Sequence, residues 1–320
     1  MHTRKVLAAS GALIMTLGLA ACGGDDGGGG GGGGDTAGLL DGASITVGSK
    51  DFDEQLILGN ISKLALENAG ADVTDQINTG GTDVARAALV NGEIDTYWEY
   101  NGTAWISFFQ ETEPIADRIE QYEVVRDRDL EENDLHWLAP ADFNNTYALA
   151  YQADAADDLG NPETLSDLAT LIEEDPDAAT LCVESEFSAR DDGLPGMEAT
   201  YGYQFPSDNV TVLDTAIVYS AAAEGDPCNF GEVFTSDGRV SALDLVVLED
   251  DEGFFPLYNP SPVFTDDVYA EYGDELTEIF DPISAALTQE EMTALNERVS
   301  VDLEDPADVA EDWLSENDFI

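Results

Sequence analysis

Residues 44–103 decide the fold, and they read SITVGSKDFDEQLILGNISKLALENAGADVTDQINTGGTDVARAALVNGEIDTYWEYNGT. Its β-branched start, Ile45-Thr46-Val47, predicts a short strand. Apolar residues at helical spacing follow as far as Gly70, and they predict an amphipathic helix that ends at this glycine. Asp51, with Glu54 three residues later, has the spacing of a capping box at the start of that helix.

The same alternation continues to the end of the stretch. Residues 72–77 and the run into Tyr97 predict two more strands, with a helix between them. This order of strands and helices predicts an α/β fold with a parallel sheet. Because the ends of parallel strands meet at one edge, we expect Lys50, the Gly80-Gly81-Thr82 turn and residues 100–103 to lie together there.

Residues 97–103 read Tyr-Trp-Glu-Tyr-Asn-Gly-Thr and place large aromatic rings beside a carboxylate at a strand end. Ligand sites of open α/β sheets lie at such ends. An aromatic lip there predicts a ligand that is flat or cationic. Trp98 and Tyr100 could equally be core aromatics, and this stretch alone leaves both interpretations open.

The N-terminus has the pattern of an export signal. Arg4 and Lys5 precede an apolar run that is too short for a stable membrane span and ends in Leu19-Ala20-Ala21-Cys22, which resembles a bacterial lipobox. We predict that residues 1–22 are a lipoprotein signal peptide and that Cys22 is lipidated. An ordinary signal with a chance cysteine is the alternative. Residues 23–43 are predicted to be a Gly-rich flexible tether.

The chain is strongly acidic. It has 68 Asp and Glu against 11 Lys and Arg, a formal net charge of −57. Such a charge argues against nucleic acid as a partner. Since hydrophobic residues still make up 43% of the chain, the acidity must lie on the surface. This pattern predicts solubility in concentrated salt, where screening weakens self-repulsion.

Cysteine and histidine are scarce. Cys182 and Cys228 remain after Cys22, and outside the cytoplasm such a pair predicts a disulfide more than two free thiols. His136 is the one histidine of the mature chain, and we expect it to be structural. A His-based triad or a multi-His zinc site therefore has almost no residues from which to be built.

A second α/β unit follows the first, and helices close the chain. Three closing helices after two sheet units predict that the chain returns to cover the first unit. The predicted strands are 145–151, 180–183, 230–234 and 243–248, and the predicted helices are 165–172 with a Thr164 cap, 213–223, 269–287, 289–299 with a Thr288 cap, and 306–317.

Taken in order, short blocks of this sequence resemble the substrate-binding proteins of ABC importers for quaternary-amine osmoprotectants such as glycine betaine, choline and carnitine. The resemblance spans essentially Ile45 to the C-terminus. The blocks that carry it are Gly48 to Phe52 with Glu54-Gln55, Gly80-Gly81-Thr82, Glu99 to Thr103, Asn144 to Leu149, Glu186 to Pro195, Thr235 to Arg239, and Leu248 to Asp251 with Pro256 to Tyr258.

The resemblance implies a two-lobe, periplasmic-binding-protein-like (type II) α/β fold with two hinge crossings that closes on its ligand. Lobe I would comprise residues 44–144 plus 257–320, and lobe II residues 145–256. It also implies a ligand site, whose residues are transferred position by position. Phe234 stands where members have a fourth cage tyrosine, and Asn101 stands where Thr is usual. The cage positions fall on Tyr100, Tyr147, Phe234 and Tyr258, the carboxylate-binding positions on Lys50, Thr103 and Arg190, and two flanking positions of open role on Glu186 and Asp192.

The chemistry of these residue types agrees with the resemblance. A trimethylammonium group has no N–H to donate, so aromatic faces must attract it instead. Arg190 offers a planar fork to a carboxylate and Lys50 a point charge. Because Thr103 is a neutral donor and both bases would be left unused by choline, we expect a zwitterion such as glycine betaine to be preferred.

The function implied by the resemblance is that of a monomeric, extracytoplasmic solute-binding lipoprotein, not an enzyme. It would be anchored to the outer face of the membrane, would deliver a glycine betaine-like osmolyte to an ABC transporter permease, and would need no metal, nucleotide or redox cofactor. Two alternatives come from other classes. One is a hydrolase that uses paired carboxylates such as Glu99 and Glu186, and the other is a surface lipoprotein without a transport role.

Overall fold

The structure of the protein, a computed structural model, describes residues 36–320. The predicted signal peptide, Cys22 and most of the predicted tether lie outside the described residues. The last residues assigned to the tether form turns, in which the Leu40 side chain is fully buried in the core and its amide donates to Ala69 O at 2.8 Å. The packed part of the chain therefore includes residues before the predicted first strand.

The first sheet has the strand order β2-β1-β3-β10-β4. β1 is parallel to β2 and β3, as predicted, whereas β10 is antiparallel to both β3 and β4. The sheet is therefore mixed rather than wholly parallel, because β10 enters from the second lobe in the opposite direction. Its strands are β1 (Ser44–Gly48), β2 (Asp72–Gln76), β3 (Thr96–Tyr100), β4 (Leu135–Trp137) and β10 (Pro260–Thr265).

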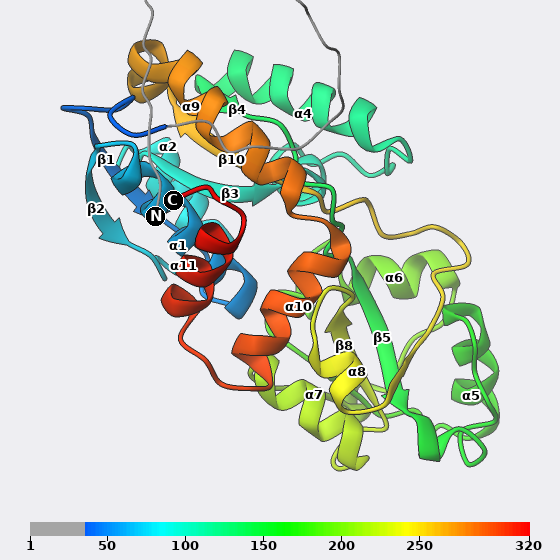
Figure 1. Ribbon diagram of the computed structural model, residues 1–320. Helices are drawn as coiled ribbons and strands as arrows, with labels where there is room; N and C mark the ends of the chain where they lie inside the picture. Colours follow the sequence, from blue (N-terminus) through cyan, green and yellow to red (C-terminus); the bar gives the residue numbers. More distant parts are fainter. Residues whose placement is uncertain (1–35) are drawn as a thin grey trace, which may run out of the picture. The chain divides into compact units, whose positions relative to one another are not determined.

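Helices pack around this sheet (Figure 1). The predicted helices are present, but the capping box at Asp51 is wrong. Phe52 is the N-cap of α1 and makes no side-chain cap, because the Glu54 carboxylate turns into the interior. Thr288 caps α10 as predicted. The helices are α1 (Asp53–Asn68), α2 (Thr82–Val90), the short α3 (Asn101–Thr103) with a π-helical turn (Ala104–Phe108), α4 (Arg118–Asn133), α9 (Asp266–Ala286), α10 (Gln289–Ser300) and α11 (Pro306–Glu316).

The second sheet repeats this plan with the strand order β7-β6-β8-β5-β9. β6 is parallel to β7 and β8, and β5 is antiparallel to β8 and β9. β5, like β10 in the first sheet, is thus the strand that arrives from the other lobe. The strands are β5 (Tyr147–Gln152), β6 (Leu181–Val183), β7 (Val210–Val212), β8 (Phe230–Phe234) and β9 (Leu245–Val247).

The predicted disulfide between Cys182 and Cys228 is confirmed, with Cα atoms 5.6 Å apart. It ties Cys182 of β6 to Cys228, which lies two residues before the start of β8. The predicted Thr164 cap is also present, as a capping box with Asp167. The helices of the second lobe are α5 (Leu168–Glu174), α6 (Leu194–Tyr201), α7 (Thr215–Glu224) and α8 (Arg239–Ala242), with 3₁₀ turns at Ala153–Ala155, Leu165–Asp167 and Ser207–Asn209.

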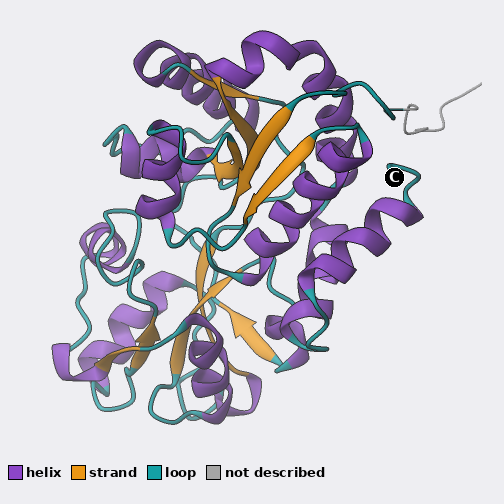
Figure 2. Ribbon diagram, turned by 90° about the vertical axis from the view of Figure 1, so that its left-hand side faces the viewer, coloured by secondary structure: helices purple, strands orange, loops and turns teal. Residues whose placement is uncertain are grey.

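The chain crosses between the sheets twice, after β4 and again after β9. Figure 2 shows the strands in two groups, each flanked by helices. Two such sheets joined by two crossings form the two-lobe, periplasmic-binding-protein-like type II fold, and the predicted fold class is confirmed. We use "first lobe" for residues 36–144 and 257–320, and "second lobe" for residues 145–256.

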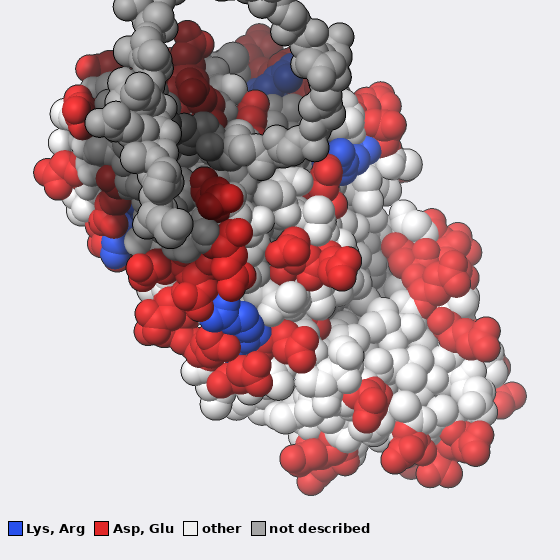
Figure 3. Space-filling view, viewed as in Figure 1, with Lys and Arg blue, Asp and Glu red and all other residues white. Residues whose placement is uncertain are grey.

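The closing helices cover the first lobe, as predicted. Met292 and Leu295 of α10 and Val309 and Trp313 of α11 are buried in the same core cluster as the apolar face of α1. On the face drawn in Figure 3, red Asp and Glu atoms are spread widely and blue Lys and Arg atoms are few. None of the helices within residues 36–320 combines the length and the hydropathy that a membrane span requires.

Candidate ligand-binding site

A cavity of about 210 Å³ lies between the two lobes and is lined by residues from both. We call it the ligand cavity. Every residue of the predicted ligand site lines this cavity except Asp192, which instead contacts the lining residues Arg190 and Tyr258. Whether these residues bind a ligand stays a prediction, but the fold brings them together. The lining residues are Lys50, Asp51, Phe52, Gly81, Thr82, Tyr100, Thr103, Asn145, Tyr147, Glu184, Ser185, Glu186, Arg190, Thr215, Phe234 and Tyr258.

The ends of parallel strands place the first-lobe residues of the cavity. Lys50 follows β1, Tyr100 ends β3, and Thr103 lies in the short helix after β3. Thr82 starts α2 behind its two glycines. The expectation that these segments share one edge of the sheet is met, because all of them line the same cavity.

Aromatic rings form the walls of the ligand cavity. The Tyr147 centroid lies 5.2 Å from that of Phe234 and 5.5 Å from that of Tyr258. Phe52 stacks on Phe234 at 5.5 Å and on Tyr100 at 6.2 Å, so it joins rings that come from different lobes. Phe52 belongs to the Gly48 to Phe52 block that carries the family resemblance, but the resemblance placed no cage position on it. Its position two residues after Lys50 was the available signal.

Two of the tyrosines at the predicted cage positions are fixed by their hydroxyl groups. Tyr100 Oη donates to Glu54 at 2.6 Å, and Tyr258 Oη donates to Asp192 at 2.7 Å. Burial raises the pKa of Tyr100, Tyr147 and Tyr258 well above the usual value. The three tyrosines are therefore neutral phenols, and Tyr100 and Tyr258 are anchored through their hydroxyl groups. Phe234 has no hydroxyl that could anchor it in this way.

Lys50 is not a free cation. It is 2% exposed, and its Nζ lies 2.7 Å from Glu99 Oε1. Glu99 also accepts hydrogen bonds from the Tyr97 hydroxyl at 2.5 Å and from the Tyr100 amide at 2.7 Å. A ligand carboxylate would therefore meet a lysine whose charge Glu99 already balances. Glu99 itself is fully buried in this arrangement.

Arg190 is paired in the same way. Its Nε and Nη2 donate to the two oxygens of Asp192 at 2.7 and 2.6 Å. The guanidinium carbon lies 5.8 Å from the Tyr147 ring centroid. Asp192 is 1% exposed and also accepts from Tyr258, which belongs to the first lobe. Arg190 is thus part of a buried, two-lobe network and not of a surface ion pair.

Glu186 reaches from the second lobe to the first. Its Oε1 accepts from the Thr82 amide at 2.8 Å, and its Oε2 lies 3.3 Å from Arg190 Nη1. Burial alone would raise the pKa of Glu186, but hydrogen bonding to Thr82 and the charges of Lys50 and Arg190 lower it overall. Glu186 is therefore ionised, and its carboxylate lies at the N-terminus of α2.

Glu54 links the lobes behind the cavity, a role that sequence analysis missed because the local spacing pointed to a cap. The side chain is 3% exposed and accepts from Tyr100 Oη, Asn145 Nδ2, Ser236 Oγ and Asn296 Nδ2, all within 2.6 to 2.8 Å. Burial raises the pKa of Glu54, and these hydrogen bonds partly offset the rise. The carboxylate connects α1, β3, the first crossing, the second lobe and α10.

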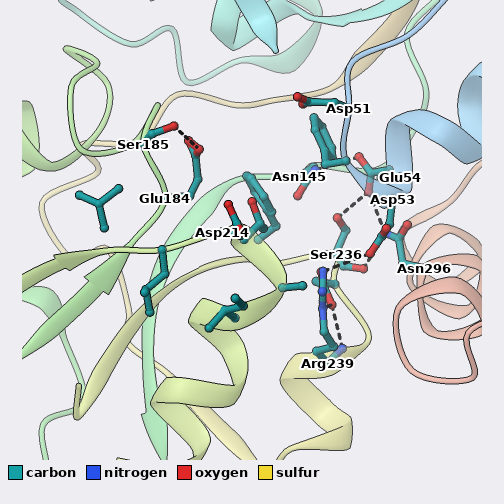
Figure 4. Close-up of a pocket in the computed structure, with 18 residues that line it drawn as sticks. Asp51, Asp53, Glu54, Asn145, Glu184, Ser185, Asp214, Ser236, Arg239 and Asn296 are labelled. Atoms are coloured by element: carbon teal, nitrogen blue, oxygen red, sulfur yellow. Dashed lines mark hydrogen bonds and ion pairs between the residues drawn. The ribbon is translucent and has the colours of Figure 1, made fainter. Parts of the chain in front are cut away.

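A larger, more open cavity of about 650 Å³ adjoins the ligand cavity. We call it the outer cavity; Figure 4 shows its lining side chains. Phe52, Asn145 and Phe234 line both cavities. Arg239 donates to Asp237 at 2.9 Å and lies 3.4 Å from Asp53, so it is also paired. The remaining charged residues that line the outer cavity are acidic: Asp51, Glu54, Glu184 and Asp214.

His136 takes no part in either cavity. Its Nε2 lies 2.9 Å from Asp266 Oδ1, and its ring stacks on Tyr269 at 4.0 Å between centroids. These contacts are structural, as expected.

Sequence comparison adds the family. Over residues 43–316 the chain matches the OpuAC family, described as the substrate binding domain of ABC-type glycine betaine transport system. The chain belongs to this family. The resemblance carried by the ordered sequence blocks is thereby confirmed.

Relatives of this OpuAC member cover nearly the whole chain. A glycine-betaine-binding protein of Pseudomonas aeruginosa is 37% identical over 290 residues, 89% of this chain and 91% of that protein. The glycine betaine-binding protein YehZ of Escherichia coli is 34% identical over 277 residues, 85% of this chain and 90% of that protein. A crystal structure of a glycine betaine/carnitine/choline ABC transporter is 27% identical, with a TM-score of 0.68, and covers 86% of this chain and 99% of that one.

Members of the OpuAC family are substrate-binding components of glycine betaine-type ABC transporters. The protein is accordingly such a component and not an enzyme, and the hydrolase alternative is wrong. Glu99 and Glu186, the carboxylates of that alternative, are engaged with Lys50 and with Thr82 and Arg190.

Proposed function

We propose that the protein captures a quaternary-ammonium osmoprotectant of the glycine betaine class in the ligand cavity and delivers it to the permease of an ABC transporter. The observation that supports this most strongly is the convergence of aromatic rings from both lobes on one small cavity. Its volume of about 210 Å³ lies below the roughly 300 to 1,000 Å³ of pockets for drug-sized molecules. The cavity suits a small solute.

The methylated nitrogen would lie among Tyr100, Tyr147, Phe234 and Tyr258, with Phe52 as an additional wall. Each ring that faces a desolvated cation contributes on the order of 0.5 to 2 kcal/mol. Since burial keeps the tyrosines protonated, attraction comes from ring faces and not from phenolate charge.

At the other end, we propose that Lys50, Thr103 and Arg190 hold the ligand carboxylate. Lys50 and Arg190 would act as members of ion pairs with Glu99 and Asp192. Because Asp192 occupies Nε and Nη2 of Arg190, a ligand carboxylate would use the remaining guanidinium donors, which the pair holds in a fixed direction.

We further propose that the chain works as a monomer anchored through Cys22 to the outer face of the membrane, with the Gly-rich segment as its tether. The N-terminal sequence pattern supports this part. A Cys22→Ser variant should leave the membrane fraction and appear in the medium or the soluble extract. Retention of that variant on membranes would contradict a lipid anchor.

Titration calorimetry tests the ligand class. Glycine betaine, proline betaine, carnitine, ectoine and choline are titrated at high salt, together with 3,3-dimethylbutanoate, in which carbon replaces the charged nitrogen of glycine betaine. We expect saturable binding of glycine betaine and at least about tenfold weaker binding of the neutral-headed analogue. Equal affinity for the two would exclude recognition by cation–π attraction. Absence of binding and of thermal stabilisation with every solute would favour the surface-lipoprotein alternative.

A further inference from the structure

The carboxylate of Glu186 lies where the first lobe attracts negative charge. Its Oε1 accepts from Thr82 N at 2.8 Å, at the start of α2, a helix of 9 residues. Free amides and the dipole of such a helix end favour an anion. The second oxygen, Oε2, lies 3.3 Å from Arg190 Nη1. The position is thus surrounded by groups that would also attract a ligand carboxylate.

Local geometry is adapted to an anion at this point. A Cβ atom on Gly81 would lie 2.6 Å from Glu186 Oε1, which is far inside van der Waals contact. Glycine at 81 therefore permits a carboxylate to reach the Thr82 amide.

The two bases of the cavity are already paired without a ligand. Lys50 is neutralised by Glu99 and Arg190 by Asp192. Glu186 adds a further negative charge next to both bases. A cationic ligand would find a partner in this carboxylate, whereas the acid end of a zwitterion would meet like charge.

We propose that Glu186 competes with the carboxylate of a zwitterionic ligand for Arg190 and the Thr82 amide, and that it thereby sets the selectivity between zwitterionic and purely cationic quaternary amines. This inference rests on the proposed function of the ligand cavity. Two ionised carboxylates cannot share one donor without a large cost. A betaine must therefore displace Glu186, and choline binds with Glu186 in place.

The test is a Glu186→Gln variant titrated calorimetrically with glycine betaine and with choline. Glutamine keeps an acceptor oxygen for Thr82 but removes the charge. We expect glycine betaine to bind at least about tenfold more tightly than to the wild type, while choline binds equally or more weakly. Asp191→Asn is the matched control, because Asp191 is an exposed carboxylate of the same loop that does not line the cavity.

A Gly81→Ala variant examines the same site by steric means. The added methyl group should keep a carboxylate away from Thr82. Glycine betaine should therefore bind more weakly, and the loss of affinity for choline should be much smaller. Circular dichroism and thermal melting establish that each variant is folded, and either variant alone can decide the question.

An unchanged ratio of glycine betaine to choline affinity in either folded variant would overturn the role of Glu186. So would an equal change of that ratio in Asp191→Asn, since the effect would then be one of general charge. A wild type that binds neither solute would instead refute the proposed function itself.

Discussion

Replacement of Glu232 by Gln should stabilise the protein, and the gain should grow with pH. Glu232 lies on β8 and is 1% exposed. Its Oε2 accepts from the Glu184 amide at 3.0 Å, and its Oε1 has no partner among the described residues. Burial raises the pKa of Glu232 to about 8, with Glu184 and Glu186 contributing further repulsion and the Glu184 amide and Arg190 opposing it.

The magnitude follows from proton linkage. The ordinary pKa of 4.5 applies to the unfolded chain, so between pH 4.5 and about 8 the unfolded state loses this proton while the folded state keeps it. Stability of the wild type then falls by about 1.4 kcal/mol for each pH unit in this window. Below it both states are protonated, and above it the full cost is present. The neutral amide of the Glu232→Gln variant carries no such cost.

Urea unfolding followed by circular dichroism, at constant salt and at several pH values, measures the effect. The difference in unfolding free energy between Glu232→Gln and the wild type should rise by about 3 kcal/mol from pH 5 to pH 7.5. Asp191→Asn, at an exposed position of the neighbouring loop, should show no such rise. Parallel pH profiles for Glu232→Gln and the wild type would refute the reasoning.

Other perturbations have equally definite outcomes. Tyr147→Leu should weaken glycine betaine binding about 2- to 30-fold in calorimetry, because one ring is lost, and Tyr147→Phe should bind within about twofold of the wild type; equal losses in both would deny the ring its role. Replacement of Cys182 and Cys228 by Ala, which removes a bridge across 46 residues, should lower the unfolding free energy by roughly 4 kcal/mol; an unchanged urea midpoint would show that the bridge adds nothing. Raising sodium chloride from 0.1 M to 1 M shortens the screening length from about 10 to about 3 Å and should raise the melting temperature of this acidic chain, and a falling value would contradict the surface-repulsion account.

The elements of the first sheet could be predicted as far as local periodicity determines them. β1, α1, β2, α2 and β3 follow from the alternation of apolar spacings between residues 44 and 100. β10 could not be predicted, because Pro260 and Pro262 argue against a strand inside a sheet. The carbonyl oxygens of these prolines nevertheless accept from Ala141 and Leu138, and the missing N–H groups do not prevent pairing with β3 and β4.

The order of the sequence blocks predicted which rings share one cavity, but not how the charges there are paired. Tyr100, Tyr147, Phe234 and Tyr258 converge on one cavity, as the family resemblance implied. The pairing of Lys50 with Glu99 and the cross-lobe reach of Glu186 to Thr82 join residues 49 and 104 positions apart. Local periodicity carries no information on contacts between residues so far apart in the sequence. Because the chain has 68 acidic residues, the sequence also offers too many equivalent partners for each base. The expected preference for zwitterions therefore did not take into account the carboxylates that pair with Lys50 and Arg190.

A crystal structure of the protein with glycine betaine tests the central claim most directly. The account predicts that the methylated nitrogen lies within about 6 Å of the ring centroids of Tyr100, Tyr147 and Tyr258, inside the cavity shared by the two lobes. A ligand bound in the outer cavity instead, with its nitrogen away from these rings, would contradict it.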